Sequence, residues 1–209
     1  DVRIYDRALS ASEVLALYNL EKPKVALTNA NFQTAANLWF SDEANATNTY
    51  GHISDWNVSQ VTDMSEAFKD RSSFDTNITD WDVSNVTTMN HMFANASSFN
   101  QPIGNWEVSA VTNMNYMFAG TMFNQPVGDW NVSSVTNMAG MFANTPFNQP
   151  IGDWDVSSVT KMDRMFKSAA PFNQPIEDWD VSSVTEVQEM FKHSSLDQPL
   201  GDWNVASVT

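Results

Sequence analysis

The chain has 209 residues, of which 42% are hydrophobic and 17% are charged, so its composition is that of a globular protein and not of a disordered one. Its 25 acidic residues outnumber its 10 basic ones, and the formal net charge of -15 disfavours nucleic acid and anionic lipid as partners. The absence of cysteine excludes disulfide scaffolds, zinc–thiolate sites and thiol catalysis.

The first 22 residues look like the end of a separate unit. The stretch "DVRIYD" predicts a strand, and "SASEVLALY" predicts a short helix that Ser10 or Ser12 caps and that ends near Tyr18. This N-terminus has neither the basic nor the apolar part of an export signal, and the chain has no run of about eighteen apolar residues. We therefore expect no direct membrane insertion in this segment.

Residues 23–54 are predicted to form a linker and an N-terminal cap. "KPK" at 22–24 is typical of a linker, and the helical spacing of Phe32, Ala35, Ala36, Trp39 and Phe40 predicts a helix in the cap.

From residue 55 to 209 one motif recurs, with "FNQPIGDWDVSSVTKMDRMF" at 147–166 as an example. Its tryptophans follow one another at intervals of 24 or 25 residues, at Trp56, Trp81, Trp106, Trp130, Trp154, Trp179 and Trp203. Such a fixed period is the mark of a repeat architecture. The last repeat breaks off at Thr209, so we expect further repeats or another chain to cover that end.

Each repeat has two apolar patterns. In "DWDV", Trp154 and Val156 alternate with aspartates, which predicts a short strand with one buried face. In "VTKMDRMF", Met162 and Met165 follow helical spacing, and Thr160 stands where an N-cap would be. The threonine column is thus predicted to cap helices; a ligand-binding or ice-binding row is the alternative.

These patterns predict an α/β repeat solenoid of the leucine-rich-repeat type. Each of about seven repeats would contribute one short parallel strand and one short helix, with a helical cap at the N-terminal end. A single repeat buries too few side chains to fold alone, so stability would come from stacking.

The repeats of residues 28–209 resemble those of the BspA-like family of bacterial surface proteins, whose units are leucine-rich-repeat-like. The resemblance implies an exported protein tied to surface attachment, aggregation or binding of host extracellular proteins, with no enzymatic activity. Residues 1–22 resemble the closing strand and tail of a laminin-G-like, concanavalin-A-like sandwich. The resemblance to both families implies a cell-surface or extracellular location.

Acidic side chains flank most of the tryptophans and would stack in two columns. Like charges at the spacing of stacked strands, about 4.8 Å, repel one another unless cations or hydrogen bonds offset them. Calcium prefers oxygen ligands, so a bridging calcium is one possibility, and no other cofactor is expected. A solvated face with side-chain turns is the other. The calcium candidates are Asp80, Asp82, Asp129, Asp153, Asp155, Asp178 and Asp180.

A third column, with Asn100, Asn124, Asn148 and Asn173, is predicted to satisfy backbone groups between repeats. The three histidines, His52, His91 and His193, share no spacing that would assemble a metal site or a triad. We therefore expect a non-enzymatic extracellular scaffold that binds protein or glycan. The alternative is a fibre subunit that binds copies of itself, with solenoids stacked end to end.

Overall fold

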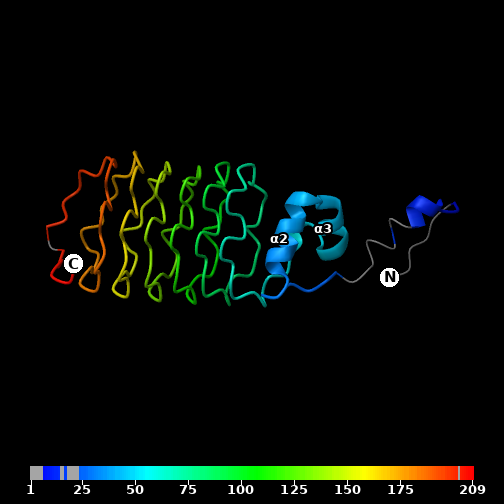
Figure 1. The fold of residues 1–209 in the computed structure, drawn as a ribbon, viewed down its shortest axis with the longest axis horizontal. Helices are drawn as coiled ribbons and strands as arrows, with labels where there is room; N and C mark the ends of the chain where they lie inside the picture. The colour runs from blue at the N-terminus through cyan, green and yellow to red at the C-terminus, as the bar shows by residue number, and fades with distance from the viewer. Residues whose placement is uncertain (1–6, 15–16, 18–23, 202) are drawn as a thin grey trace.

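The computed structural model describes residues 7–14, 17, 24–201 and 203–209. It contains the helices α2 (Phe32–Ser41) and α3 (Glu43–Tyr50) and the short 3-10 helix η1 (Ile53–Asp55). Figure 1 shows α2 and α3 at one end of a row of similar backbone coils, which lie side by side along the long axis of the molecule. In the described part of the chain, no helix has the length and apolar character to cross a membrane.

A capping box opens the helical turn at residues 11–14. The backbone N–H of Glu13 donates to Ser10 Oγ at 3.3 Å, and the backbone N–H of Ser10 donates to Glu13 Oε2 at 2.8 Å. Ser10, and not Ser12, is therefore the N-cap. The strand predicted from "DVRIYD", the predicted helix end near Tyr18 and most of the predicted linker lie outside the described residues.

The helix predicted in the cap is present as α2. Four of the five residues of the predicted pattern, Phe32, Ala35, Ala36 and Trp39, are buried, and Phe40 is partly buried against the core. This apolar face covers the first repeat, where Phe32 contacts Trp56 edge to face at a centroid distance of 6.3 Å. The following helix, α3, begins where the Asp42 side chain accepts a hydrogen bond from the backbone N–H of Asn45.

The rest of the chain is a stack of repeats, each of which begins three residues before a tryptophan. Neighbouring repeats are joined by a single parallel bridge at the residue after the threonine, as in Asp63–Thr88 and Lys161–Glu186. Repeats 1 to 7 begin at Ile53, Ile78, Ile103, Val127, Ile151, Ile176 and Leu200.

The predicted α/β solenoid is wrong, and the strand in each repeat is the first error. The described residues of the repeats contain only these isolated bridges and no extended strand. The alternation predicted for "DWDV" is correct, because Trp154 and Val156 are buried while the two aspartates are exposed. Turns enclose this segment, however: Trp154 N donates to Ile151 O and Val159 N to Val156 O. Too few extended residues remain between the turns to form a ladder.

The helix in each repeat is the second error. In its place lies a run of turns, which we call the turn run: residues 64–70, 89–95, 114–120, 138–144, 162–168 and 187–193. In an α-helix, each backbone N–H donates to the carbonyl oxygen four residues earlier. Here Met162 N donates instead to Glu186 O at 2.8 Å, and Phe166 N to Met190 O at 2.9 Å, both in the next repeat. Consecutive turns bury every third or fourth residue, which is why the spacing looked helical.

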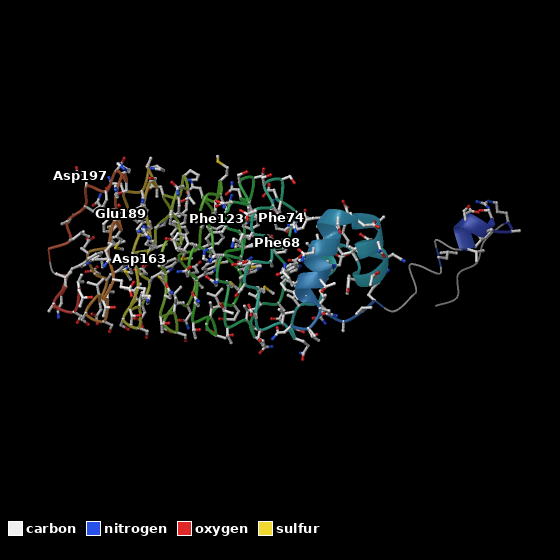
Figure 2. All side chains as sticks on the ribbon, viewed as in Figure 1. Phe68, Phe74, Phe123, Asp163, Glu189 and Asp197 are labelled. Atoms are coloured by element: carbon white, nitrogen blue, oxygen red, sulfur yellow. The ribbon has the colours of Figure 1, made fainter. Side chains whose placement is uncertain are left out.

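Aromatic ladders fill the interior of the stack. Ring centroids are 5.5 to 5.8 Å apart along Phe68, Phe93, Phe118, Phe142, Phe166 and Phe191. A second ladder at 5.9 to 6.3 Å runs through Phe74, Phe99, Phe123, Phe147 and Phe172. Figure 2 shows Phe68 and Phe74 close to α2, where the ladders begin. Burial of each ring contributes on the order of 1.5–3 kcal/mol.

Candidate interaction surface

The seven calcium candidates are all exposed on the outside of the stack. Those that follow a tryptophan already accept hydrogen bonds from the serine two residues further on: Asp155 Oδ1 accepts from the backbone N–H of Ser157 at 3.1 Å and from its hydroxyl at 2.6 Å. Asp82 is bound in the same way by Ser84, and Asp180 accepts from the backbone N–H of Ser182. The asparagines at this position, such as Asn131, make the same turn without a charge.

These hydrogen bonds lower the pKa of Asp82, Asp155 and Asp180, with the serine hydroxyl as the largest cause in each case. For Asp155 the charge of Asp180 acts in the opposite direction and raises the pKa, which is the predicted repulsion within the column. The serine donors thus stabilise the ionised carboxylates, which is the role that the side-chain-turn alternative gave them.

The candidates before a tryptophan are Asp80, Asp129, Asp153 and Asp178. One of them, Asp129, lines a shallow hollow beside Pro126 and Gly128. Nowhere among the residues that the structure describes do three or more histidine, aspartate or glutamate side chains come together as a metal site. Bridging calcium therefore stays a prediction.

The threonine column caps no helix, so that prediction is wrong. Each threonine binds the threonine of the preceding repeat: Thr87 N and Thr87 Oγ1 both donate to Thr62 O, at 2.8 and 3.1 Å. The same pair of bonds recurs up to Thr185. At the N-terminal end Asn29 takes the place of a preceding repeat, because its Oδ1 accepts from Thr62 N at 2.8 Å.

The predicted role of the asparagine column is confirmed. Asn124 N donates to Asn100 Oδ1 and Asn148 N donates to Asn124 Oδ1, both at 2.9 Å. The side chain of Gln149 adds a bond to Asn124 O at 3.1 Å. Each asparagine therefore accepts from the backbone of the next repeat, and the column is structural.

Two of the three histidines contact aromatic rings. His52 packs edge to face on Trp39 at 4.9 Å, and His91 stacks on Tyr116 at 5.1 Å. Burial is the main reason why the pKa of His91 is lowered, followed by the charge of Lys69.

The surface that sequence reasoning missed is the outer side of the turn run. Two residues of every turn run have positive φ, four positions apart. The first left-handed column holds a different kind of side chain in almost every repeat: Glu66, His91, Tyr116, Gly140, Arg164 and Glu189. The second holds Asp70, Asn95, Gly120, Asn144, Ser168 and His193. Comparison of the repeats at this position was the signal that could have revealed it.

An ion-pair network lies at the C-terminal end of the first column. Glu189 accepts from Lys167 Nζ at 2.6 Å and pairs with Lys192 and Arg164. These cations, Lys167 first, lower the pKa of Glu189 to about 2. Figure 2 labels Glu189 and Asp163 on the last repeats of the stack. A second pair, Lys161 with Glu186 at 2.7 Å, bridges the same two repeats.

The fold and surface define a class of protein: a stack of turn-built repeats with a constant interior and a variable outer column. One family model matches this chain, at residues 34–146 and 121–209, and its description is "Mycoplasma protein of unknown function, DUF285". Because these matches cover most of the chain, the protein belongs to the DUF285 family. No curated protein and no solved structure matches the chain.

Proposed function

We propose that this chain is part of a cell-surface or extracellular repeat protein that acts as a non-enzymatic scaffold and binds protein or glycan. The observation that carries the proposal is the contrast between the inside and the outside of the repeats. The buried tryptophan column is the same residue throughout, whereas the first left-handed column changes from Glu66 to Tyr116 to Arg164. A constant core with variable outer positions is how stacked repeats present binding surfaces.

The hydrogen bonds between polar groups of neighbouring repeats also support a role as a scaffold. The threonine, asparagine and tryptophan columns direct their hydrogen bonds into neighbouring repeats, as in Thr87 to Thr62 and Asn148 to Asn124. Side chains used in this way hold the scaffold together. Apart from Gly140, the residues of the first left-handed column are exposed or half-buried, so their side chains are available to a partner.

The resemblance of the repeats to BspA-like surface proteins supports attachment as the role and the cell exterior as the location. The printed description of the DUF285 family assigns no function. The net charge of -15 favours partners other than nucleic acid. We also propose, from the resemblance alone, that residues 1–22 are the tail of a laminin-G-like sandwich.

The alternative, a fibre subunit assembled end to end, has less support. A neighbouring copy would have to reach the rings of the first repeat. Those rings are already covered by α2, because Phe40 contacts both Phe68 and Phe74 at 6.1 and 5.7 Å. The scaffold is therefore the function that we propose.

The test uses the 209-residue chain immobilised on a sensor surface. It is exposed to a panel of purified extracellular-matrix proteins and to a glycan array. A matched control replaces the outer side chains His91, Tyr116 and Arg164 with asparagine, which accepts a left-handed backbone. We expect saturable binding by at least one partner and its loss in the control. The absence of saturable binding to every protein and every glycan would contradict the proposal.

A further inference from the structure

The two left-handed columns differ in the types of residue that occupy them. Asparagine, aspartate and glycine adopt a positive φ at the least cost, and they hold four of the six positions of the second column. The first column instead places His91, Tyr116 and Arg164 at φ values of 54°, 50° and 57°. Backbone outliers of this kind gather where a side chain is kept for its function.

The side chains of the first column form a continuous strip. The rings of His91 and Tyr116 are stacked, with centroids 5.1 Å apart and planes 18° from parallel. The Tyr116 ring then covers Gly140, where an added Cβ would lie only 2.3 Å from Tyr116 Cε1. Beyond Gly140, the Tyr116 hydroxyl is the largest cause of the raised pKa of the Arg164 guanidinium. Glycine at 140 is thus what allows the ring to lie across the neighbouring repeat.

This strip crosses the largest uncharged area of the turn runs. We call it the uncharged face: residues 88–95, 113–120 and 137–144, which contain no Asp, Glu, Lys or Arg. All six basic residues between 25 and 209 lie on the turn runs or within two residues of them, before and after this face: Lys69, Arg71, Lys161, Arg164, Lys167 and Lys192. Charged pairs therefore border a neutral centre, on a chain whose net charge is -15.

Amide groups beside the two rings have unused hydrogen-bonding capacity. Asn113 Oδ1 accepts from the backbone N–H of Asn115, and Asn137 Oδ1 accepts from that of Ala139, both at 3.0 Å. These bonds show that the accepting atom of each side chain is its Oδ1. The Nδ2 groups of both asparagines therefore remain available as hydrogen-bond donors. Within the described residues, neither Nδ2 group nor the side chain of Asn115 has a hydrogen-bond partner. All three asparagines are half-buried.

We propose that the uncharged face binds a neutral oligosaccharide, with sugar C–H groups against the outer edges of the Tyr116 and His91 rings and hydroxyls bonded to Asn113, Asn115 and Asn137. An anionic glycan would meet the negative potential of the whole chain. A purely apolar ligand would bury the amides without partners, which is costly. A neutral ligand rich in hydroxyls satisfies the amides and contacts the rings. The inference rests on the proposed scaffold function and names its ligand class and its face.

The test is an array of defined glycans, neutral, sialylated and sulfated, probed with the full chain and four variants. Tyr116→Ala removes the ring, and Tyr116→Phe keeps it. Gly140→Ala keeps Tyr116 but displaces it. Ser168→Ala introduces alanine at another left-handed position, also at φ 57° but outside the uncharged face, and is the matched control. Thermal unfolding of each variant shows that it is folded.

We expect binding to neutral glycans that weakens at least about tenfold in Tyr116→Ala and in Gly140→Ala. Tyr116→Phe, which keeps the ring, should bind more tightly than Tyr116→Ala, and Ser168→Ala should stay within about twofold of the unmodified chain. The inference is overturned if no neutral glycan binds, if sialylated or sulfated glycans bind better, or if the folded Gly140→Ala variant binds unchanged. Binding to a matrix protein without any glycan binding also overturns it, yet leaves the scaffold function standing. Failure of both classes of partner removes both proposals.

Discussion

The indole Nε1 of Trp106 donates a hydrogen bond to the carbonyl oxygen of Ile78, 3.2 Å away in the preceding repeat. The bond recurs from Trp81 to Trp203 at 2.9 to 3.3 Å, always to the first residue of the repeat before. Both groups lie in the buried interior, where water cannot replace either partner. The tryptophan column therefore joins the repeats through polar bonds as well as through ring packing.

Replacement of Trp106 by phenylalanine should lower the free energy of unfolding by about 1–3 kcal/mol, because the Ile78 carbonyl would lose its buried donor. Equilibrium unfolding in urea measures the change. Tyr50→Phe is a control, since it removes a polar group from an aromatic ring that has no hydrogen bond among the described residues. Equal stability of Trp106→Phe and the unmodified chain would show that the indole bond contributes nothing.

Two substitutions in the asparagine column distinguish the loss of a hydrogen-bond acceptor from the addition of a charge. Asn124 Oδ1 accepts from Asn148 N at 2.9 Å and from Gln149 Nε2 at 3.1 Å. Asn124→Ala should cost about 1–3 kcal/mol of unfolding free energy, because these donors lose their acceptor. Asn124→Asp should cost less, because a carboxylate accepts the same bonds, as Asp75 does for Asn100 N. Urea unfolding of both variants decides the order; equal losses would refute the acceptor role.

The period of the repeat and the identity of the core were predictable from the sequence. The period of the tryptophans and the alternation around Trp154 identify which side chains are buried, and the asparagine column follows from the same register. These features depend only on whether a side chain faces the interior or the exterior of its repeat. That information is present in apolar spacing, whatever the backbone conformation.

The backbone conformation was not predictable from spacing alone. Consecutive turns and a short helix bury the same positions, and only the left-handed residues distinguish them. Such residues were hard to recognise because the first column places Tyr116 and Arg164 there, and neither is typical of that conformation. The threonine column was misinterpreted for a related reason: a hydroxyl beside a predicted helix was taken as a cap, while Thr87 binds Thr62 of the preceding repeat.

The backbone at Gly128 lies so close to that of the next repeat that we expect alanine to be poorly tolerated there. A Cβ at residue 128 would lie 2.8 Å from the carbonyl oxygen of Pro150, which is backbone and cannot move aside. Gly128→Ala should therefore lower the free energy of unfolding by about 1–3 kcal/mol. Gly201→Ala is the matched control, because a Cβ there would meet nothing within 4 Å. Thermal and urea unfolding measure both variants, and a harmless Gly128→Ala would mean that the repeats can separate.

The ion-pair network around Glu189 predicts a dependence of stability on pH. Lys167 and Lys192 lower the pKa of this carboxyl from 4.5 to about 2. A lowered native pKa means that the unfolded chain takes up the proton first, so the stabilisation is complete above pH 4.5 and is lost as the pH falls toward 2. Over this range, the unfolding free energy of Glu189→Gln should fall less steeply than that of the unmodified chain.

Urea unfolding at a series of pH values measures these slopes. Glu177→Gln is the control, since it removes an exposed carboxylate from the same region of the stack, where the structure shows no ion pair for Glu177 among the described residues. Identical slopes for Glu189→Gln and the unmodified chain would contradict the predicted contribution of the network.

The calcium prediction for the aspartate columns is tested by the thermal midpoint. An ion that binds only the folded chain raises the midpoint in proportion to the logarithm of its concentration above the dissociation constant. Bridging calcium thus predicts a higher midpoint in millimolar calcium and a lower one with chelator. The response should disappear when Asp153 and Asp178, which occupy the same column in adjacent repeats, are both replaced by asparagine.

Ionic strength is the confounding variable, because any salt screens the repulsion within a chain of net charge -15. Sodium chloride at matched ionic strength is therefore the control, and only the additional rise in calcium counts as binding. Screening acts on Asp155 and Asp180 regardless of the ion, whereas a bridging site needs a divalent cation and unoccupied carboxylate oxygens. A midpoint that follows ionic strength alone would assign the stability of the columns to the serine hydrogen bonds at Asp82, Asp155 and Asp180, with no metal involved.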